Sequence, residues 1–175
     1  LPLSWSATER VRWKLPLPGP GNSTPIVWKG KLFLTQATAG GAMRWTWCVD
    51  SKSGKVLWKK SVAYSGSEPT HATNPFCSAS PVTDGERVIV SHGSAGLFCY
   101  DLTGEELWRV MHGGANTACP ALFHNGVLFF NSGDVTNRLM AVRPDGHGDV
   151  TETHVKWSTM RGVPSRPSVL LSGDS

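Results

Sequence analysis

The sequence predicts an all-β fold built from small antiparallel sheets, and two observations lead to this prediction. No stretch of ten residues keeps the apolar spacing of an amphipathic helix, whereas short apolar runs alternate with turn residues. One phrase also recurs: Cys48–Trp58 and Cys99–Trp108 each run from an apolar strand through Asp and a Gly turn to Trp, 50 residues apart. A period of roughly 40–50 residues made of short strands is typical of propeller blades. We therefore expect a partial β-propeller of four-stranded antiparallel blades, about three blades plus a fraction.

The first segment with strand character is residues 9–15, which alternate polar and apolar side chains before a loop rich in Pro and Gly. Trp13 precedes Trp58 by 45 residues, which is close to the repeat period. We therefore interpret residues 9–15 as the last strand of a preceding blade.

The first full repeat occupies approximately residues 22–62 and contains four apolar runs separated by turn residues. Lys29–Gly30 separates the first two runs, Gly40–Gly41 the next two, and Gly54 precedes the fourth. Gly between two apolar runs is a hairpin signal. The repeat therefore predicts a four-stranded antiparallel blade.

The second repeat, approximately residues 77–111, follows the same order of strands and turns. Asp84–Gly85 lies between its first two strands, and Asp-Gly between alternating apolar runs is a strong hairpin signal. Residues 93–96 form the next turn, and the strand that ends the repeat carries Trp108.

The third repeat, approximately residues 117–159, is weaker but has the same plan. Asn125–Gly126 takes the place of the first hairpin turn, and an enlarged turn at residues 143–149 precedes the fourth strand. Trp157 follows Trp108 by 49 residues. The start of another blade is expected within residues 164–175. Residues 1–175 are thus predicted as a single partial β-propeller domain.

Each blade needs a large flat side chain to fill the wedge between it and its neighbour, because a twisted four-stranded sheet cannot bury both faces alone. The turn before each Trp needs a side chain that accepts backbone N–H groups and a Gly that takes positive φ at little cost. These requirements predict the structural blade-docking residues Asp50, Gly54, Trp58, Asp101, Gly104, Trp108 and Trp157.

Composition excludes several classes of protein. The net charge of +4 is dispersed, so the clustered stripe of a nucleic-acid-binding protein is lacking. No window approaches the ~18 apolar residues of a membrane span, and no signal peptide precedes Leu1. Because the chain also lacks an initiating Met, we expect it to begin inside a longer protein.

Two stretches, Asp50–Trp58 and Asp101–Trp108, resemble the tryptophan-docking motif of pyrroloquinoline-quinone-type (PQQ-like) β-propeller repeats. The runs at residues 69–81 and 148–154 resemble bacterial, especially planctomycete-like, members of that family. The resemblance covers nearly the whole chain. It implies a larger protein that is exported to the periplasm or cell envelope and closes a ring of seven or eight blades.

The sequence also departs from the family pattern. The turn before Trp108 is one residue shorter than the turn before Trp58, and Trp157 is not preceded by a simple Gly-x-x-x-Trp. Nothing matches the adjacent cysteines and carboxylate-rich calcium site that the resemblance implies for quinoprotein dehydrogenases. We therefore predict no cofactor, and PQQ and calcium enter only under an alternative function.

The best candidate ligand site consists of His71, Asn74 and His92, in or near the long loop at residues 64–76. Polar residues at blade ends can point into a central funnel. In the alternative interpretation, His71, Asn74 and their neighbours only satisfy the backbone groups of a Pro-rich loop. The six histidines show no HxH or HExxH spacing, so no metal site is predicted.

The four cysteines, Cys48, Cys77, Cys99 and Cys119, form no CxxC pair. Unpaired buried thiols, one or two disulfides, and a metal site all stay open for them. No Gly-x-Ser-x-Gly elbow and no phosphate-binding loop occurs, so no catalytic residue is predicted.

We expect a non-catalytic β-propeller module that binds or scaffolds, within an exported bacterial protein. It would recognise a partner protein or small ligand through its blade-end loops. The alternative is a fragment of a PQQ-dependent dehydrogenase that oxidises alcohols or sugars, and a third possibility is a truncated segment without function. An open arc has unpaired edges, so we expect it to close with further sequence, pair with another copy, or be only marginally stable.

Overall fold

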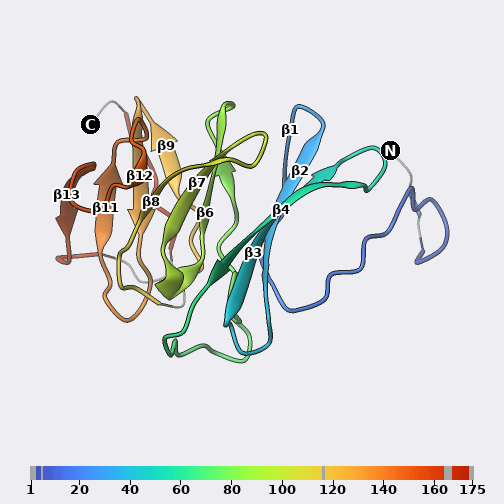
Figure 1. Ribbon diagram of the computed structural model, residues 1–175, viewed down its shortest axis with the longest axis horizontal. Helices are drawn as coiled ribbons and strands as arrows, with labels where there is room; N and C mark the ends of the chain where they lie inside the picture. The colour runs from blue at the N-terminus through green and yellow to red at the C-terminus, as the bar shows by residue number, and fades with distance from the viewer. Residues whose placement is uncertain (1–2, 5, 116, 164–166, 174–175) are drawn as a thin grey trace.

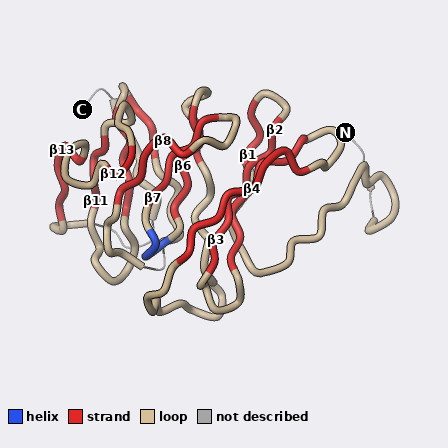
Figure 2. Tube along the Cα trace, in the orientation of Figure 1, coloured by secondary structure: helices blue, strands red, loops and turns tan. Residues whose placement is uncertain are grey.

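The computed structural model describes residues 3–4, 6–115, 117–163 and 167–173, and its strands form three small sheets that stand in a row (Figure 1). The sheets follow one another in chain order, and the row does not close into a ring. A 3-10 turn at Gly93–Ala95 is the only helical element among these residues (Figure 2). The prediction of an all-β partial propeller is therefore confirmed.

The first sheet contains four antiparallel strands in the order β1-β2-β3-β4. Its hairpin turn places Lys29 at φ +46° and Gly30 at φ +77°, as a tight two-residue connection requires. Cys48 lies opposite both Phe33 and Trp58 at the centre of the sheet. The strands are β1 (Ile26–Trp28), β2 (Lys31–Ala37), β3 (Met43–Asp50) and β4 (Val56–Ala63).

The second and third sheets repeat this antiparallel plan. The second contains β5 (Val82–Thr83), β6 (Arg87–Ser91), β7 (Leu97–Asp101) and β8 (Glu106–Val110). The third contains β9 (Leu122–His124), β10 (Val127–Asn131), β11 (Leu139–Val142) and β13 (Val155–Thr159).

The second sheet has a fifth strand that the sequence did not predict. β12 (Gly148–Asp149) belongs to the enlarged turn of the third repeat, yet it pairs in parallel with β8, placing Gly148 opposite Trp108. The backbone N–H of Val150 continues this contact by donating to the carbonyl of Arg109 at 2.9 Å. The insertion thus covers the outer edge of β8, which would otherwise expose unpaired backbone groups.

Alternating residues of the second sheet form the two main cores. Val88, Phe98 and Tyr100 pack toward the first sheet, in a cluster with Phe33 and Cys48. Their sequence neighbours point the opposite way, as the period of two in a strand requires. Those neighbours form the cluster with the third sheet, which contains Ile89, Leu97, Cys99, Trp108, Leu128, Phe130, Met140 and Val142. The middle sheet is therefore buried on both faces.

Both chain ends differ from the prediction. Residues 9–15 form no strand, although Trp13 and Leu15 pack against the first sheet. The expected strand in residues 164–175 is also missing from its described part, residues 167–173. A segment with strand character needs an adjacent strand to bond to, and the described residues of these two segments pair with none.

Within the described residues, no helix has the length and apolar character needed to span a membrane. The four cysteines are buried and form no disulfide with one another.

Candidate functional site

Three tryptophans each join their own segment to a turn of the following sheet in the same way. The indole N–H of Trp58 donates to the carbonyl of Leu102 at 3.2 Å, and its ring lies against Gly104. Trp108 donates in the same manner to the carbonyl of Pro144 at 2.8 Å. Trp13 also follows this pattern, since it donates to the carbonyl of Ser51 at 3.1 Å. Trp13 therefore docks on the turn of the first sheet as the other two tryptophans dock on theirs, even though its own segment forms no strand.

The turns that receive these indoles are held by their aspartates. The Oδ1 atom of Asp50 accepts hydrogen bonds from the backbone N–H groups of Lys52 and Ser53, at 3.1 and 2.7 Å, and from the Ser53 hydroxyl. These bonds, led by the one from the hydroxyl, lower the pKa of the Asp50 carboxyl. Asp101 organises the second turn in the same way through Thr103.

Trp157 differs from the other predicted docking residues. Its side chain is 45% exposed, and its ring centroid lies 6.1 Å from that of Phe129 on the outer face of the third sheet. Within the described residues, no carbonyl accepts a hydrogen bond from its indole N–H. Among the described residues, no further sheet lies beside Trp157 for it to dock on.

The structure separates the three residues of the predicted ligand site. His71 is exposed in the long loop, where its Nδ1 atom lies 2.8 Å from the Thr73 hydroxyl and its backbone bridges to Asn74. His92 is fully buried: Nε2 lies 3.1 Å from the Thr46 hydroxyl and Nδ1 3.4 Å from the Cys77 sulfur. Burial, together with the nearby Arg44 charge, lowers the pKa of His92 to about 3. His71 and Asn74 are therefore neighbours, whereas His92 belongs to the core.

A buried ion pair, which the sequence gave no reason to expect, fixes the long loop. Arg44 on β3 and Glu68 in the loop are 1% and 2% exposed at their side chains, and Nη1 lies 2.5 Å from Oε2. The Arg44 guanidinium also donates to the carbonyls of Gly41 and His92. Buried charges are stable only when they are paired and hydrogen-bonded, as both are here. Because its partners lie in three places, the Arg44 guanidinium links the first sheet, the loop and the second sheet.

Two aromatic rings complete this arrangement. The Arg44 guanidinium lies 4.8 Å from the ring centroid of Tyr64 and 5.0 Å from that of Phe76, at the two ends of the loop. The Glu68 carboxylate accepts a hydrogen bond from the backbone N–H of Ser94 at 3.2 Å. The loop at residues 64–76 is consequently anchored at its ends and its middle, while its tip at His71 faces solvent.

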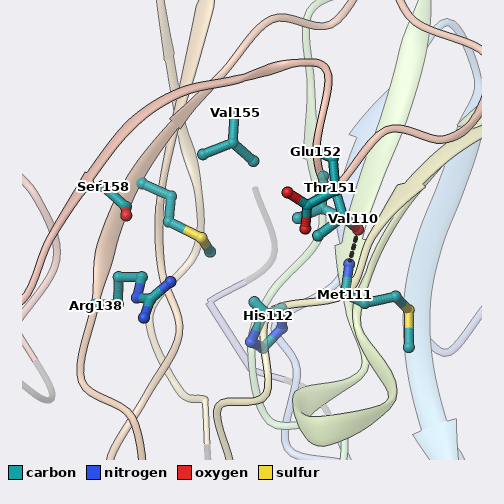
Figure 3. A pocket seen from close by; sticks show the side chains of 9 residues that line it. Val110, Met111, His112, Arg138, Thr151, Glu152, Val155 and Ser158 are labelled. Carbon is teal, nitrogen blue, oxygen red and sulfur yellow. Dashed lines mark hydrogen bonds between the residues drawn. The ribbon is translucent and has the colours of Figure 1, made fainter.

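A polar cavity of about 260 Å³ lies between the second and third sheets (Figure 3). Its apolar wall comes from Val110, Met140 and Val155, and exposed residues surround its mouth. His112 and Arg138 supply its basic groups. The remaining lining residues are Met111, Thr151, Glu152 and Ser158.

His112 carries a buried hydrogen-bond donor in the lining of this cavity. Its side chain is nine-tenths buried, and its Nδ1 atom accepts the backbone N–H of Gly114 at 3.1 Å. Burial lowers the pKa of His112 to about 4, so the ring is neutral at pH 7 and its proton resides on Nε2. Among the described residues, Nε2 has no hydrogen-bond partner.

Arg138 adds a second donor of the same kind. Its Nε atom is buried and has no hydrogen-bond partner among the described residues, while its Nη2 atom lies 4.0 Å from the Met160 sulfur. In Figure 3 the Arg138 and His112 side chains face each other across the cavity, with the Glu152 carboxylate beyond them. Within the described part of the chain, no group of three or more His, Cys, Asp or Glu residues could hold a metal ion.

The sequence did not predict this cavity. In the sequence, His112 is only one of six scattered histidines, and Arg138 has no motif around it. His112 and Arg138 come to line one cavity because of how the second sheet packs against the third and because of the path of the 143–149 insertion. No local sequence motif predicts either of these features.

Comparison with known families matches residues 43–174 to the family described as "Outer membrane protein assembly factor BamB". No curated protein shows a significant match. Among solved structures, a europium-containing methanol dehydrogenase is 15% identical, with a TM-score of 0.58 over 86% of this chain. The computationally designed Ika8 protein is 10% identical, with a TM-score of 0.58 over 85%. A quinohemoprotein alcohol dehydrogenase from Pseudomonas putida HK5 is 16% identical, with a TM-score of 0.52 over 79%.

The chain spans only part of these structures: 36%, 39% and 26% of their lengths, in the order given. At these identities the likeness concerns the fold.

Proposed function

The chain belongs to the family described as outer membrane protein assembly factor BamB, and we propose that it is a non-catalytic β-propeller module that binds a partner protein through its blade-end loops. The proposed setting is an exported bacterial protein of the periplasm or cell envelope, where such an assembly factor would work. The chain would then hold its partner in place, and the partner would carry any chemistry.

The observation that carries this proposal is the anchored loop at residues 64–76. A binding surface gains affinity when its loops are already ordered, because less conformational entropy is lost on association. The buried Arg44–Glu68 pair provides that order, while the loop tip around His71 and Thr73 stays exposed. The loop at residues 64–76 connects the last strand of the first sheet to the second sheet. The corresponding connection from the second sheet to the third begins at Met111, beside the polar cavity.

Site-specific crosslinking in the native host tests the proposal. A photoreactive residue at Ala72, in the loop tip, should give one discrete crosslinked protein of defined mass. The matched control is Lys52, which is also exposed but lies in the turn at the opposite end of β4. Equal crosslinking from both positions, or none from Ala72, would contradict a role for this loop in partner recognition.

The second candidate is a fragment of a quinone-dependent dehydrogenase, which the similar methanol and alcohol dehydrogenase structures favour. PQQ with calcium would require a cluster of oxygen ligands for the cation. The described residues contain no group of three or more His, Cys, Asp or Glu side chains placed for a metal, which favours the binding role over this candidate. Incubation with PQQ and Ca²⁺, followed by a dye-linked alcohol oxidation assay, separates the candidates. Turnover above the protein-free control would overturn the binding role.

A further inference from the structure

We propose that the cavity between the second and third sheets is a binding site for a carboxylate group. Two residues that line it, His112 and Arg138, each carry a buried hydrogen-bond donor, Nε2–H and Nε–H, that finds no acceptor among the described residues. A buried donor without a partner is unfavourable, so an acceptor that reaches it from the cavity stabilises the bound state. This proposal deepens the proposed binding function by naming the chemistry that one part of the surface recognises.

The charges of the two donors select an anion over a neutral acceptor. Arg138 is permanently cationic, and its planar guanidinium matches the geometry of a carboxylate. His112 is neutral and contributes a directed donor without adding charge. The apolar side chains of Val110, Met140 and Val155 exclude water from one wall, and hydrogen bonds are electrostatically stronger beside such a wall.

The cavity also limits the size and position of the ligand. A volume of about 260 Å³ accepts a group such as a small organic acid or the carboxylate end of a peptide, but not a folded element. The Glu152 carboxylate also lines the cavity and lies on the His112 side in Figure 3. Its negative charge opposes an incoming anion, so Glu152 sets an upper limit on the affinity.

The test uses benzoate and benzamide, which have the same shape and differ in charge. Each is titrated into the ¹⁵N-labelled protein while the His112 imidazole and Gly114 amide resonances are followed by NMR. We expect benzoate to shift both resonances saturably, and benzamide to bind about tenfold or more weakly, as the loss of a charged hydrogen bond predicts. Equal affinity for both probes, or no shift with benzoate, would overturn the proposal.

Two variants that change opposite charges keep the test informative. Arg138→Gln should weaken benzoate binding about tenfold or more, whereas Glu152→Gln should strengthen it, because Glu152 is exposed and its charge opposes the ligand. Arg161→Gln, an exposed arginine outside the cavity, is the matched control and should leave the affinity unchanged. If Arg138→Gln does not fold, the Glu152→Gln result decides: unchanged or weaker benzoate binding contradicts the proposal.

A further arm distinguishes the source of the carboxylate. An N-acetylated tetra-alanine peptide with a free C-terminus is compared with its C-terminal amide. Binding of the free acid peptide indicates a carboxylate supplied by a protein, and binding of benzoate alone indicates a free small acid. Because these titrations require no partner protein, they can fail while the crosslink from Ala72 succeeds, and the reverse also holds.

Discussion

Gly104 shows how a single residue sets the spacing between the first two sheets. Its φ is +92°, and a Cβ atom added there would lie 2.8 Å from the Trp58 ring. Gly30 also has positive φ, +77°, but a Cβ atom there would meet nothing within 4 Å. A side chain at either position would therefore meet the same backbone strain, but only a side chain at position 104 would also press on the Trp58 ring.

Replacement of Gly104 by Ala should lower the free energy of unfolding by about 2–4 kcal/mol, since positive φ and overpacking against Trp58 both contribute. Gly30→Ala should cost only about 1 kcal/mol, from the backbone strain. Urea denaturation followed by tryptophan fluorescence measures both values. Equal losses for the two variants would show that the Trp58 contact does not constrain the turn.

His112 and His92 make stability depend on pH in a definite direction. Burial lowers the pKa of these histidines to about 4 and about 3, below the ~6.5 of an unfolded chain. Between pH 6.5 and pH 4 the unfolded state therefore binds more protons than the folded state. Stability must fall as the pH falls through this range, by roughly 2–3 kcal/mol for each histidine.

Thermal denaturation between pH 7 and pH 4.5 tests this dependence, and this range stays above the carboxyl pKa values that hydrogen bonds lower. Replacing His112 by Gln removes one titrating group, so the decrease in Tm with falling pH should become smaller. His71→Gln, in the exposed loop tip, should keep the wild-type decrease. Parallel curves for His112→Gln and the wild type would mean that His112 is not buried in its neutral form.

At the scale of one element, the loop at residues 64–76 depends on the Arg44–Glu68 pair. Glu68→Gln should leave the buried Arg44 charge uncompensated, at a cost of about 3–5 kcal/mol. Release of the loop should also expose it to protease before the sheets unfold. Limited proteolysis with mass spectrometry locates the cut, and Glu105→Gln, at an exposed turn, is the control. Wild-type resistance of Glu68→Gln would show that the loop is held by other contacts.

Hairpins were the elements that sequence patterns predicted best. Asp84–Gly85 and Asn125–Gly126 both join antiparallel strands, because the geometry of such a turn depends on two adjacent residues. β12 was missed, since its pairing with β8 joins segments almost 40 residues apart and its sequence carries no strand signal. The candidate cavity was missed for the same reason: His112 and Arg138 meet only through the packing of two sheets.

At the scale of the whole molecule, the row of sheets ends on an apolar surface that no further sheet of the described residues covers. Trp157 and Phe129 lie on the outer face of the third sheet, beside Leu139 and the segment that contains Val169 and Leu170. Trp157 is 45% exposed, whereas Trp108 at the previous junction is fully buried. This difference marks the third sheet as the place where a further blade or a second copy would dock.

The chain should therefore associate through this face at micromolar concentration. Burial of an indole and its neighbours removes apolar area from water, which favours association by about 25 cal/mol per Å² before entropic costs. Trp157→Lys places a charge on the face and should shift sedimentation toward the monomer. Val135→Lys is the control, because Val135 is 57% exposed but lies in a loop away from the sheet face. If the protein without either substitution is a monomer that melts cooperatively, the open row is stable alone and needs neither a further blade nor a second copy to fold.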